Sequence, residues 1–154
     1  MQFRYSGLAV TPFQLLFAMS DVQLAARGIS RVTADAKPGF PCRVTLEDAE
    51  PGESLLLLPF EHQPAHSPYK SSGPIFVRER ADQSYNGSEF PPVFRRRLLS
   101  IRAYDGAGMM VDADVAEGDQ AESLFARMFE RDDTAYLHVH NARRGCYAAR
   151  VDRA

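Results

Sequence analysis

The chain has 154 residues, of which 45% are hydrophobic and 25% are charged, which predicts one compact domain over residues 1–154. Its formal net charge of -2 lacks the basic excess of a nucleic-acid-binding protein. Its longest apolar run, Leu55–Phe60, is far shorter than the roughly 20 residues of a membrane-spanning helix. Two distant cysteines and an N-terminus without a secretory signal favour a cytoplasmic protein with reduced thiols. We therefore expect neither a nucleic-acid nor a membrane partner.

The first half of the chain has the pattern of short strands and helices. Residues 3–10 predict a strand, and Thr11 followed by Pro12 predicts the start of a helix, with the threonine as its cap. Residues 20–27 predict a second helix that ends at Gly28. Further strands are expected at residues 30–34, 42–46, 54–60 and 74–79.

The second half begins with a predicted hairpin. Apolar residues alternate with polar ones over residues 99–105 and again over 109–115, as in two half-buried strands. A three-residue loop, 106–108, would place both apolar sets on one face. That register predicts a cross-strand ion pair between Arg102 and Asp112.

Residues 119–132 have the strongest helical pattern. Asp119 is a candidate cap, and Glu122 would complete a capping box. The apolar side chains follow the stripe of a helix that lies on a sheet: Ala121, Leu124, Phe125, Met128 and Phe129. The predicted fold class is therefore α+β, a mixed and mostly antiparallel sheet with a few short helices and this amphipathic helix packed on it.

A terminal hairpin, with strands at 135–141 and 146–151, holds two of the four histidines. Residues two apart on a strand share a face, so His138 and His140 should be neighbours. Either could act as a catalytic proton donor or acceptor, because histidine has an ordinary pKa close to neutrality.

The register of this hairpin decides whether a thiol joins the histidines. A loop of five residues places Cys146 opposite His140, which would permit a Cys–His nucleophilic pair. A loop one residue shorter turns the cysteine away, and the sequence leaves both registers open. A small buried apolar side chain is the simpler interpretation of this cysteine.

The histidine pair also permits a metal site. Zinc enzymes often take two ligands from one strand and a third from elsewhere. The third ligand could be His62, His66, Cys42 or Cys146. However, no Cys-x-x-Cys or His-Glu-x-x-His motif is present, and histidines hydrogen-bonded on a sheet face are a simpler interpretation. The sequence therefore assigns no metal ligand, and the cofactor stays unknown.

The loop at residues 62–72 joins two apolar strands and is rich in polar side chains, which is a common way to line a pocket. A solvated connection with a path fixed by prolines explains the same residues equally well. Where this loop meets the terminal hairpin, we expect basic side chains to orient an anionic small molecule. The expected ligand-binding residues are Arg43, His62, Tyr69, Lys70, Asn141 and Arg150, and the expected catalytic residues are His138, His140 and Cys146.

Several motifs are shared with a known family: residues 37–43, 46–49, 67–69, 73–78, 105–114 and 136–153. Through them the chain resembles an uncharacterised bacterial family, domain of unknown function 1203. The resemblance covers nearly the whole chain and implies a bacterial single-domain protein. It implies no activity, cofactor or catalytic residue at any position.

The sequence therefore leaves three functions open. The leading one is a site for an anionic small molecule, with histidine acid–base chemistry if it is an enzyme. The second is a metal-binding protein that uses the His-x-His pair. The third is a non-catalytic interaction domain, such as a homodimer, that recognises its partner through a sheet edge or an apolar patch.

Overall fold

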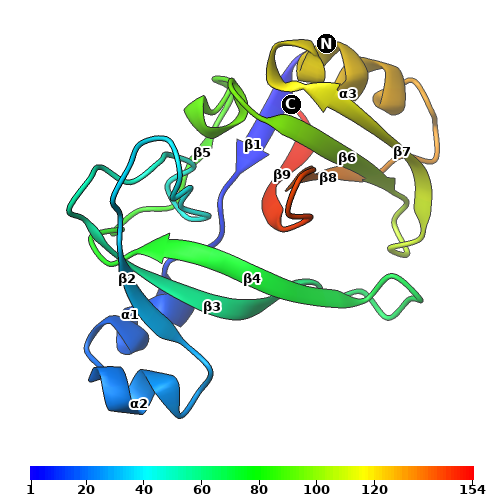
Figure 1. The fold of residues 1–154 in the computed structure, drawn as a ribbon. Coiled ribbons are helices and arrows are strands. Elements are labelled where there is room, and N and C mark those ends of the chain that lie inside the picture. Colours follow the sequence, from blue (N-terminus) through cyan, green and yellow to red (C-terminus); the bar gives the residue numbers. More distant parts are fainter.

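A computed structural model describes residues 1–154 and places two β-sheets one above the other in the view of Figure 1. All neighbouring strands within the sheets are antiparallel and the helices are short, so the fold is α+β and dominated by strands, as the sequence predicts. The upper sheet contains, in spatial order, β5 (Asn86–Gly87), β1 (Phe3–Ser6), β9 (Tyr147–Arg153), β8 (Tyr136–Asn141), β6 (Leu98–Tyr104) and β7 (Met110–Glu117). The lower sheet contains β2 (Ser30–Thr33), β3 (Ser54–Gln63) and β4 (Ser71–Arg78).

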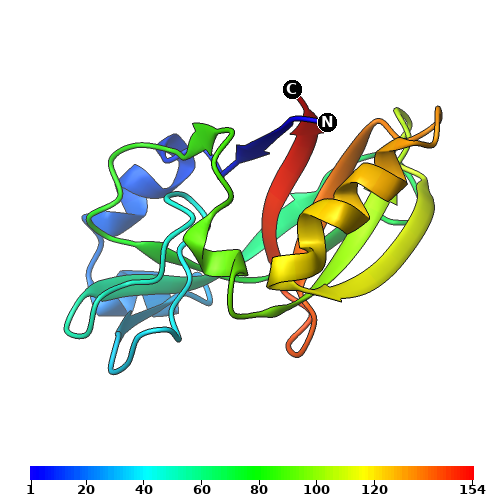
Figure 2. The ribbon, with the colours of Figure 1, turned by 90° about the horizontal axis from the view of Figure 1, so that it is seen from above.

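The upper sheet buries one face beneath the helix α3 (Ala121–Phe129), which Figure 2 shows lying across its strands. The predicted stripe is confirmed: Ala121, Phe125, Met128 and Phe129 are buried, and Leu124 is half-buried beside them. Leu137 and Val139 of β8 belong to the same core. Because side chains alternate along a strand, His138 and His140 therefore face away from α3, toward the lower sheet.

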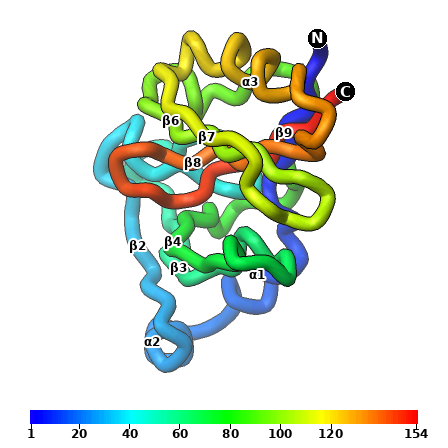
Figure 3. Tube along the Cα trace, turned by 90° about the vertical axis from the view of Figure 1, so that its right-hand side faces the viewer, coloured from blue at the N-terminus to red at the C-terminus, as the bar shows by residue number.

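The lower sheet buries its outer face beneath two short helices, α1 (Thr11–Phe17) and α2 (Asp21–Ala25). Phe13 of α1 and Leu24 of α2 are buried with Leu56 and Leu58 of β3. Figure 3 shows the resulting layers, from α3 at the top through the two sheets to α2 at the bottom. Each sheet thus has its own helical cover, and the histidines of β8 lie in the junction between the sheets.

The start of the chain differs slightly from the prediction. β1 ends at Ser6 instead of residue 10, and α1 begins at Thr11, so Val10 and not the threonine occupies the cap position. The second helix is present in a shorter form, with Ser20 and Gln23 in a capping box. The strand predicted at 42–46 is absent, since this segment forms only isolated bridges and turns.

The predicted capping contact at the start of α3 is wrong. The capping box of Asp119 and Glu122 does not form, because η2 (Gly118–Gln120) precedes the helix and the Tyr5 hydroxyl donates to the Glu122 carboxylate at 2.6 Å. Neither α3 nor any other helix of the structure is long and apolar enough to cross a membrane.

The register of β6 and β7 also departs from the prediction. Arg102 lies opposite Ala113 and not opposite Asp112, because a bulge next to Tyr104 shifts the pairing. Asp112 instead forms an ion pair with Arg127 of α3. The loop length set by Gly106–Gly108 was thus insufficient to fix the register, since a bulge adds a residue that a loop count does not include.

The chain passes from the upper to the lower sheet at Gly7. Directly after it, the amide of Leu8 donates to the Arg43 carbonyl at 2.8 Å. A Cβ at position 7 would lie 2.2 Å from the Val44 carbonyl oxygen, which is backbone and cannot easily move. Gly7→Ala is therefore expected to lower the free energy of unfolding by about 1–3 kcal/mol in urea denaturation. Gly106→Ala is the control, because a Cβ there would meet nothing; an equal loss in both variants would contradict this explanation.

Candidate functional site

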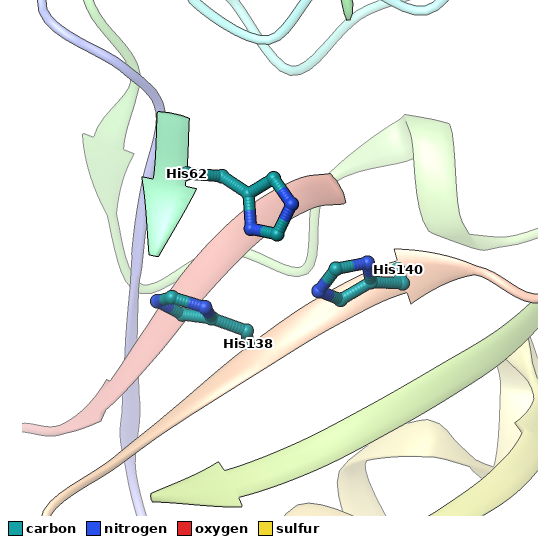
Figure 4. Close-up of side chains that lie close together, drawn as sticks. All are labelled: His62, His138 and His140. Atoms are coloured by element: carbon teal, nitrogen blue, oxygen red, sulfur yellow. The ribbon is translucent and has the colours of Figure 1, made fainter. Parts of the chain in front are cut away.

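Three histidines from the two sheets meet in the junction between them (Figure 4). His138 and His140 come from β8 and His62 comes from the end of β3, and one ring nitrogen of each lies within 4.8 Å of the others. His140 is fully buried, His138 is 4% exposed and His62 is half-buried. The cluster thus joins two strands that lie far apart in the sequence.

A β-bulge directs His62 toward the other two rings. Leu56 and Leu58 of β3 face the helices of the lower sheet, and strict alternation would turn His62 to that same side. The pairing of β3 with β4 shifts between Glu61 and Gln63. Because such a bulge interrupts the alternation, His62 faces the upper sheet instead.

A second bulge shapes the other side of the cluster. His138 pairs with Arg150 of β9, whereas His140 pairs with Tyr147, so β9 contains one extra residue at this point. Both Tyr147 and Arg150 consequently lie on the histidine face. The Tyr147 ring stacks on that of His62 with centroids 5.3 Å apart, and the rings of the other two histidines meet it at steep angles.

Each of the three rings has a nitrogen without a hydrogen-bond partner. Nδ1 of His140 lies 2.9 Å from the carbonyl oxygen of Gly145, and because a carbonyl only accepts, this nitrogen carries the proton. The buried nitrogens without a partner are Nε2 of His140, Nδ1 of His62 and Nδ1 of His138. Such an atom costs about 1–3 kcal/mol, and three of them on converging rings indicate a site shaped for a ligand.

Burial holds the three imidazoles in their neutral form. It lowers the pKa of His138 to about 3, and the charges of the other two histidines and of Arg150 add to this effect. Burial also lowers the pKa of His140 to about 4. For His62, burial and then the charge of Arg102 lower the pKa. Neutral imidazole is the form that binds a metal, whereas a proton-transfer group at neutral pH works best with a pKa near 7.

Cys146 does not form the predicted pair with His140. Its sulfur accepts hydrogen bonds from Arg43 Nη2 at 3.1 Å and from Asn141 Nδ2 at 3.7 Å. Neither of the two predicted hairpin registers is present as a whole, because the bulge in β9 changes the pairing partway along the hairpin. The ring of His140 faces the Gly145 carbonyl and Tyr147 instead of the thiol.

The loop expected to line a pocket contributes only its first residue to the cluster. Lys70 approaches Glu61 at the surface, with 3.8 Å between Nζ and Oε2, and Tyr69 is exposed. His66 is exposed as well and does not join the other histidines. Of the third metal ligands that the sequence allows, the structure brings His62 to the pair.

The other predicted ligand-binding residues lie in two places. Arg150 forms an ion pair with Asp152 and its guanidinium lies 4.1 Å from the centre of the Tyr136 ring. Arg43 and Asn141 line a cleft with Cys146, outside the histidine cluster. The predicted set is therefore divided between the cluster, its edge, this cleft and the exposed loop that carries Tyr69 and Lys70.

Sequence reasoning missed several neighbours of the cluster. Gln63 Nε2 donates to the Tyr136 hydroxyl at 3.0 Å, and the Tyr136 ring stacks on that of Tyr104 with centroids 5.4 Å apart. Arg102 pairs with His138 across β6 and β8. The sequence did indicate this face of β6. Arg102 and Tyr104 are two residues apart, so they share the face of the strand that lies opposite its apolar residues.

Most of the chain matches one protein-family model. The model described as "Protein of unknown function (DUF1203)" matches residues 39–153, which include the three histidines, Arg43 and Cys146. The chain belongs to the DUF1203 family. The matched range begins before β3, so the DUF1203 region supplies both strands of the histidine cluster. Neither the curated proteins nor the solved structures include a match to the chain.

The cluster of this DUF1203 chain has the donor set of a transition-metal site. Imidazole nitrogen is a ligand of zinc, copper, iron and nickel. Nitrogens bound to one tetrahedral zinc lie about 3.4 Å apart, since each is about 2.1 Å from the metal. The three ring nitrogens, within 4.8 Å of one another, would reach that spacing by small rotations of the side chains. The residues present therefore fit a metal ion.

Proposed function

We propose that the protein binds a divalent transition metal, zinc in the first instance, through His62, His138 and His140. The observation that supports this most strongly is the set of three buried ring nitrogens that have no hydrogen-bond partner and belong to rings facing one point. A bound metal would use all three lone pairs at once. It would thereby remove the cost of burying these polar atoms without partners.

The contact of His140 with Gly145 supports the same proposal. Histidines that bind metals usually donate their other ring N–H to a carbonyl or a carboxylate, which fixes the tautomer and the orientation of the ring. The Gly145 carbonyl accepts such a bond from Nδ1 of His140. The remaining nitrogen, Nε2, is the one that lacks a partner.

Three histidine ligands are typical of a catalytic metal site, because they leave a fourth position for water or substrate. Zinc at such a position supplies a Lewis acid, which polarises a carbonyl or activates a water molecule. Arg102 and Arg150 border the cluster and would disfavour a second positive charge. Asp152 offsets Arg150, so we expect Arg102 to favour an anionic fourth ligand, such as hydroxide or a carboxylate.

Acid–base catalysis by His138 or His140 without a metal has less support. The pKa values of about 3 and about 4 leave these groups almost entirely unprotonated at neutral pH, so neither could donate a proton efficiently there.

The free thiols of both cysteines agree with a reducing compartment, and we propose the cytoplasm of a bacterium.

Cobalt binding tests the proposal. Protein purified without nickel resin is treated with chelator, dialysed and titrated with Co²⁺, which serves as a spectroscopic substitute for zinc. We expect one equivalent to bind, with the intense visible absorption of a four- or five-coordinate ion, and one equivalent of Zn²⁺ to displace it. A Cys146→Ser variant should give the same spectrum, because the thiol lies outside the cluster. Weak absorption typical of hexaaqua cobalt throughout the titration would end the proposal.

A further inference from the structure

A second site lies at the turn of the β8–β9 hairpin, in a cleft of about 660 Å³. Its walls come from residues 39–43, from Phe76 of β4, from residues 96–98 at the start of β6, from Glu117 at the end of β7, and from the end of β8 with the following turn, residues 141–146. This volume falls within the range of small-molecule sites, roughly 300–1,000 Å³. The histidines do not line the cleft, so it is separate from the proposed metal centre.

The deepest charged group of the cleft is Arg43. Only 2% of this residue is exposed, yet no carboxylate pairs with its guanidinium. Its hydrogen bonds go to the carbonyls of Tyr147, at 2.7 Å, and Pro41, and to the sulfur of Cys146. A buried charge without a counter-ion is costly. The protein thus maintains a positive charge at the base of the cleft.

The rim of the cleft adds further positive charge. Arg96, Arg143 and Arg144 are exposed, and none of them takes part in an ion pair. Arg97 also lines the cleft, but Asp48 pairs with it at 2.7 Å and neutralises it. Against these charges the lining includes one acid, the exposed Glu117. The balance is strongly positive, in contrast to the formal charge of -2 for the whole chain.

One wall of the cleft is apolar. Phe40 and Phe76 contact each other with ring centroids 5.2 Å apart, and both line the cleft together with Leu98. Arginines provide planar donor pairs that fit carboxylate and phosphate oxygens. Aromatic faces provide contact area for the body of an organic molecule.

We propose that this cleft binds a small organic anion, with its carboxylate or phosphate group on the arginines and its apolar body against Phe40 and Phe76. Arg43 and Arg144 would hold the oxyanion, and Cys146 lies beside it. This site goes beyond the metal centre and does not depend on it. Metal binding at the histidines and anion binding in the cleft can each fail without the other.

Alkylation of Cys146 tests the charge of the cleft. The thiol lines the cleft, so its alkylation rate rises when the positive charge concentrates an anionic reagent there. Iodoacetate is an anion and iodoacetamide is neutral, and in both cases sulfur displaces iodide from the same type of carbon. We expect the ratio of the iodoacetate rate to the iodoacetamide rate to be at least about tenfold higher in the native protein than in the urea-denatured chain. Peptide mass spectrometry assigns the modification to Cys146, since Cys42 is buried.

Matched variants identify the source of the charge. Arg96→Gln and Arg144→Gln should each lower the ratio severalfold. Arg27→Gln removes the same charge from an exposed position outside the cleft and should leave the ratio unchanged. A native ratio equal to that of the denatured chain, or an equal effect of all three variants, would overturn the proposal.

Phenyl phosphate provides a second measurement that does not need a reactive thiol. We expect it to shift the backbone amide resonances of Phe40, Arg43 and residues 141–146 at millimolar concentrations, and to do so at lower concentrations than inorganic phosphate because of the apolar wall. Phenol should cause no such shifts. The absence of shifts with phenyl phosphate, or shifts spread over the whole surface, would count decisively against a built site. The measurement is made in the presence of EDTA, so its outcome is independent of the metal centre.

Discussion

His138→Ala is expected to lower the affinity for zinc by more than about 100-fold. Loss of an outer contact to a metal ligand already costs 10–100-fold in affinity, and this variant removes a ligand itself. The cluster contains His62, His138 and His140 and no cysteine or carboxylate, so no other side chain of the cluster could replace His138. Competition against a chromophoric chelator measures the dissociation constant of each variant. His62→Ala and His140→Ala should show losses of similar size.

His66→Ala is the matched control, since this histidine is exposed and lies outside the cluster. It should bind zinc as tightly as the wild type. A second variant, His138→Leu, separates binding from folding. It removes a buried nitrogen without a partner, so the metal-free protein should be about as stable as the wild type or about 1 kcal/mol more stable. Tight zinc binding by His138→Leu would contradict the three-histidine centre.

The elements with strong local patterns were predictable from the sequence. The apolar stripe of α3 follows helical spacing and is buried as expected. The alternation of β8 places His138 and His140 on one face, and Gly28, with a φ of 72°, follows the second helix. These features depend on neighbouring residues alone, so periodicity and end residues are sufficient to find them.

The remainder of the site depends on bulges and on the packing of one sheet against the other. His62 reaches the cluster only because the β3–β4 pairing shifts beside it. The bulge in β9 likewise brings Tyr147 to the histidines and leaves Cys146 with Arg43. A bulge is one extra residue in a ladder, and neither composition nor loop length reports it. The division of the predicted residues between two sites was therefore beyond the sequence.

Tyr147 connects the two sites. Its ring stacks on that of His62, while its backbone carbonyl accepts the 2.7 Å hydrogen bond from Arg43 Nε. The side chain thus belongs to the proposed metal centre and the main chain to the wall of the cleft. An anion bound to the Arg43 guanidinium would be linked, through this hydrogen bond, to the segment of β9 that borders the histidines.

Glu53→Gln is expected to lower the free energy of unfolding by about 3–5 kcal/mol, because it removes the counter-ion of a buried arginine. The Arg78 residue is 7% exposed, and its Nε and Nη2 donate to the two carboxylate oxygens of Glu53 at 3.0 and 2.7 Å. The second acid on this guanidinium, Glu47, is more than half exposed, so solvent screens its contribution. Glu47→Gln is therefore the control and should cost at most about 1 kcal/mol in urea denaturation at pH 7. Equal losses in the two variants would show that burial of the pair is not the cause.

The pH dependence of the same pair gives a second, independent check. Burial raises the pKa of Glu53, but the hydrogen bonds from Arg78 outweigh this effect and lower it below the ordinary value of about 4.3. A carboxyl with a lowered pKa in the folded protein contributes its full stability above the ordinary value. That contribution disappears as the pH falls through the folded-state pKa, where Glu53 becomes neutral. The difference in stability between wild type and Glu53→Gln should therefore be largest near pH 7 and shrink in acid. A constant difference from pH 7 to pH 3 would mean that the amide disturbs the packing and not the charge balance.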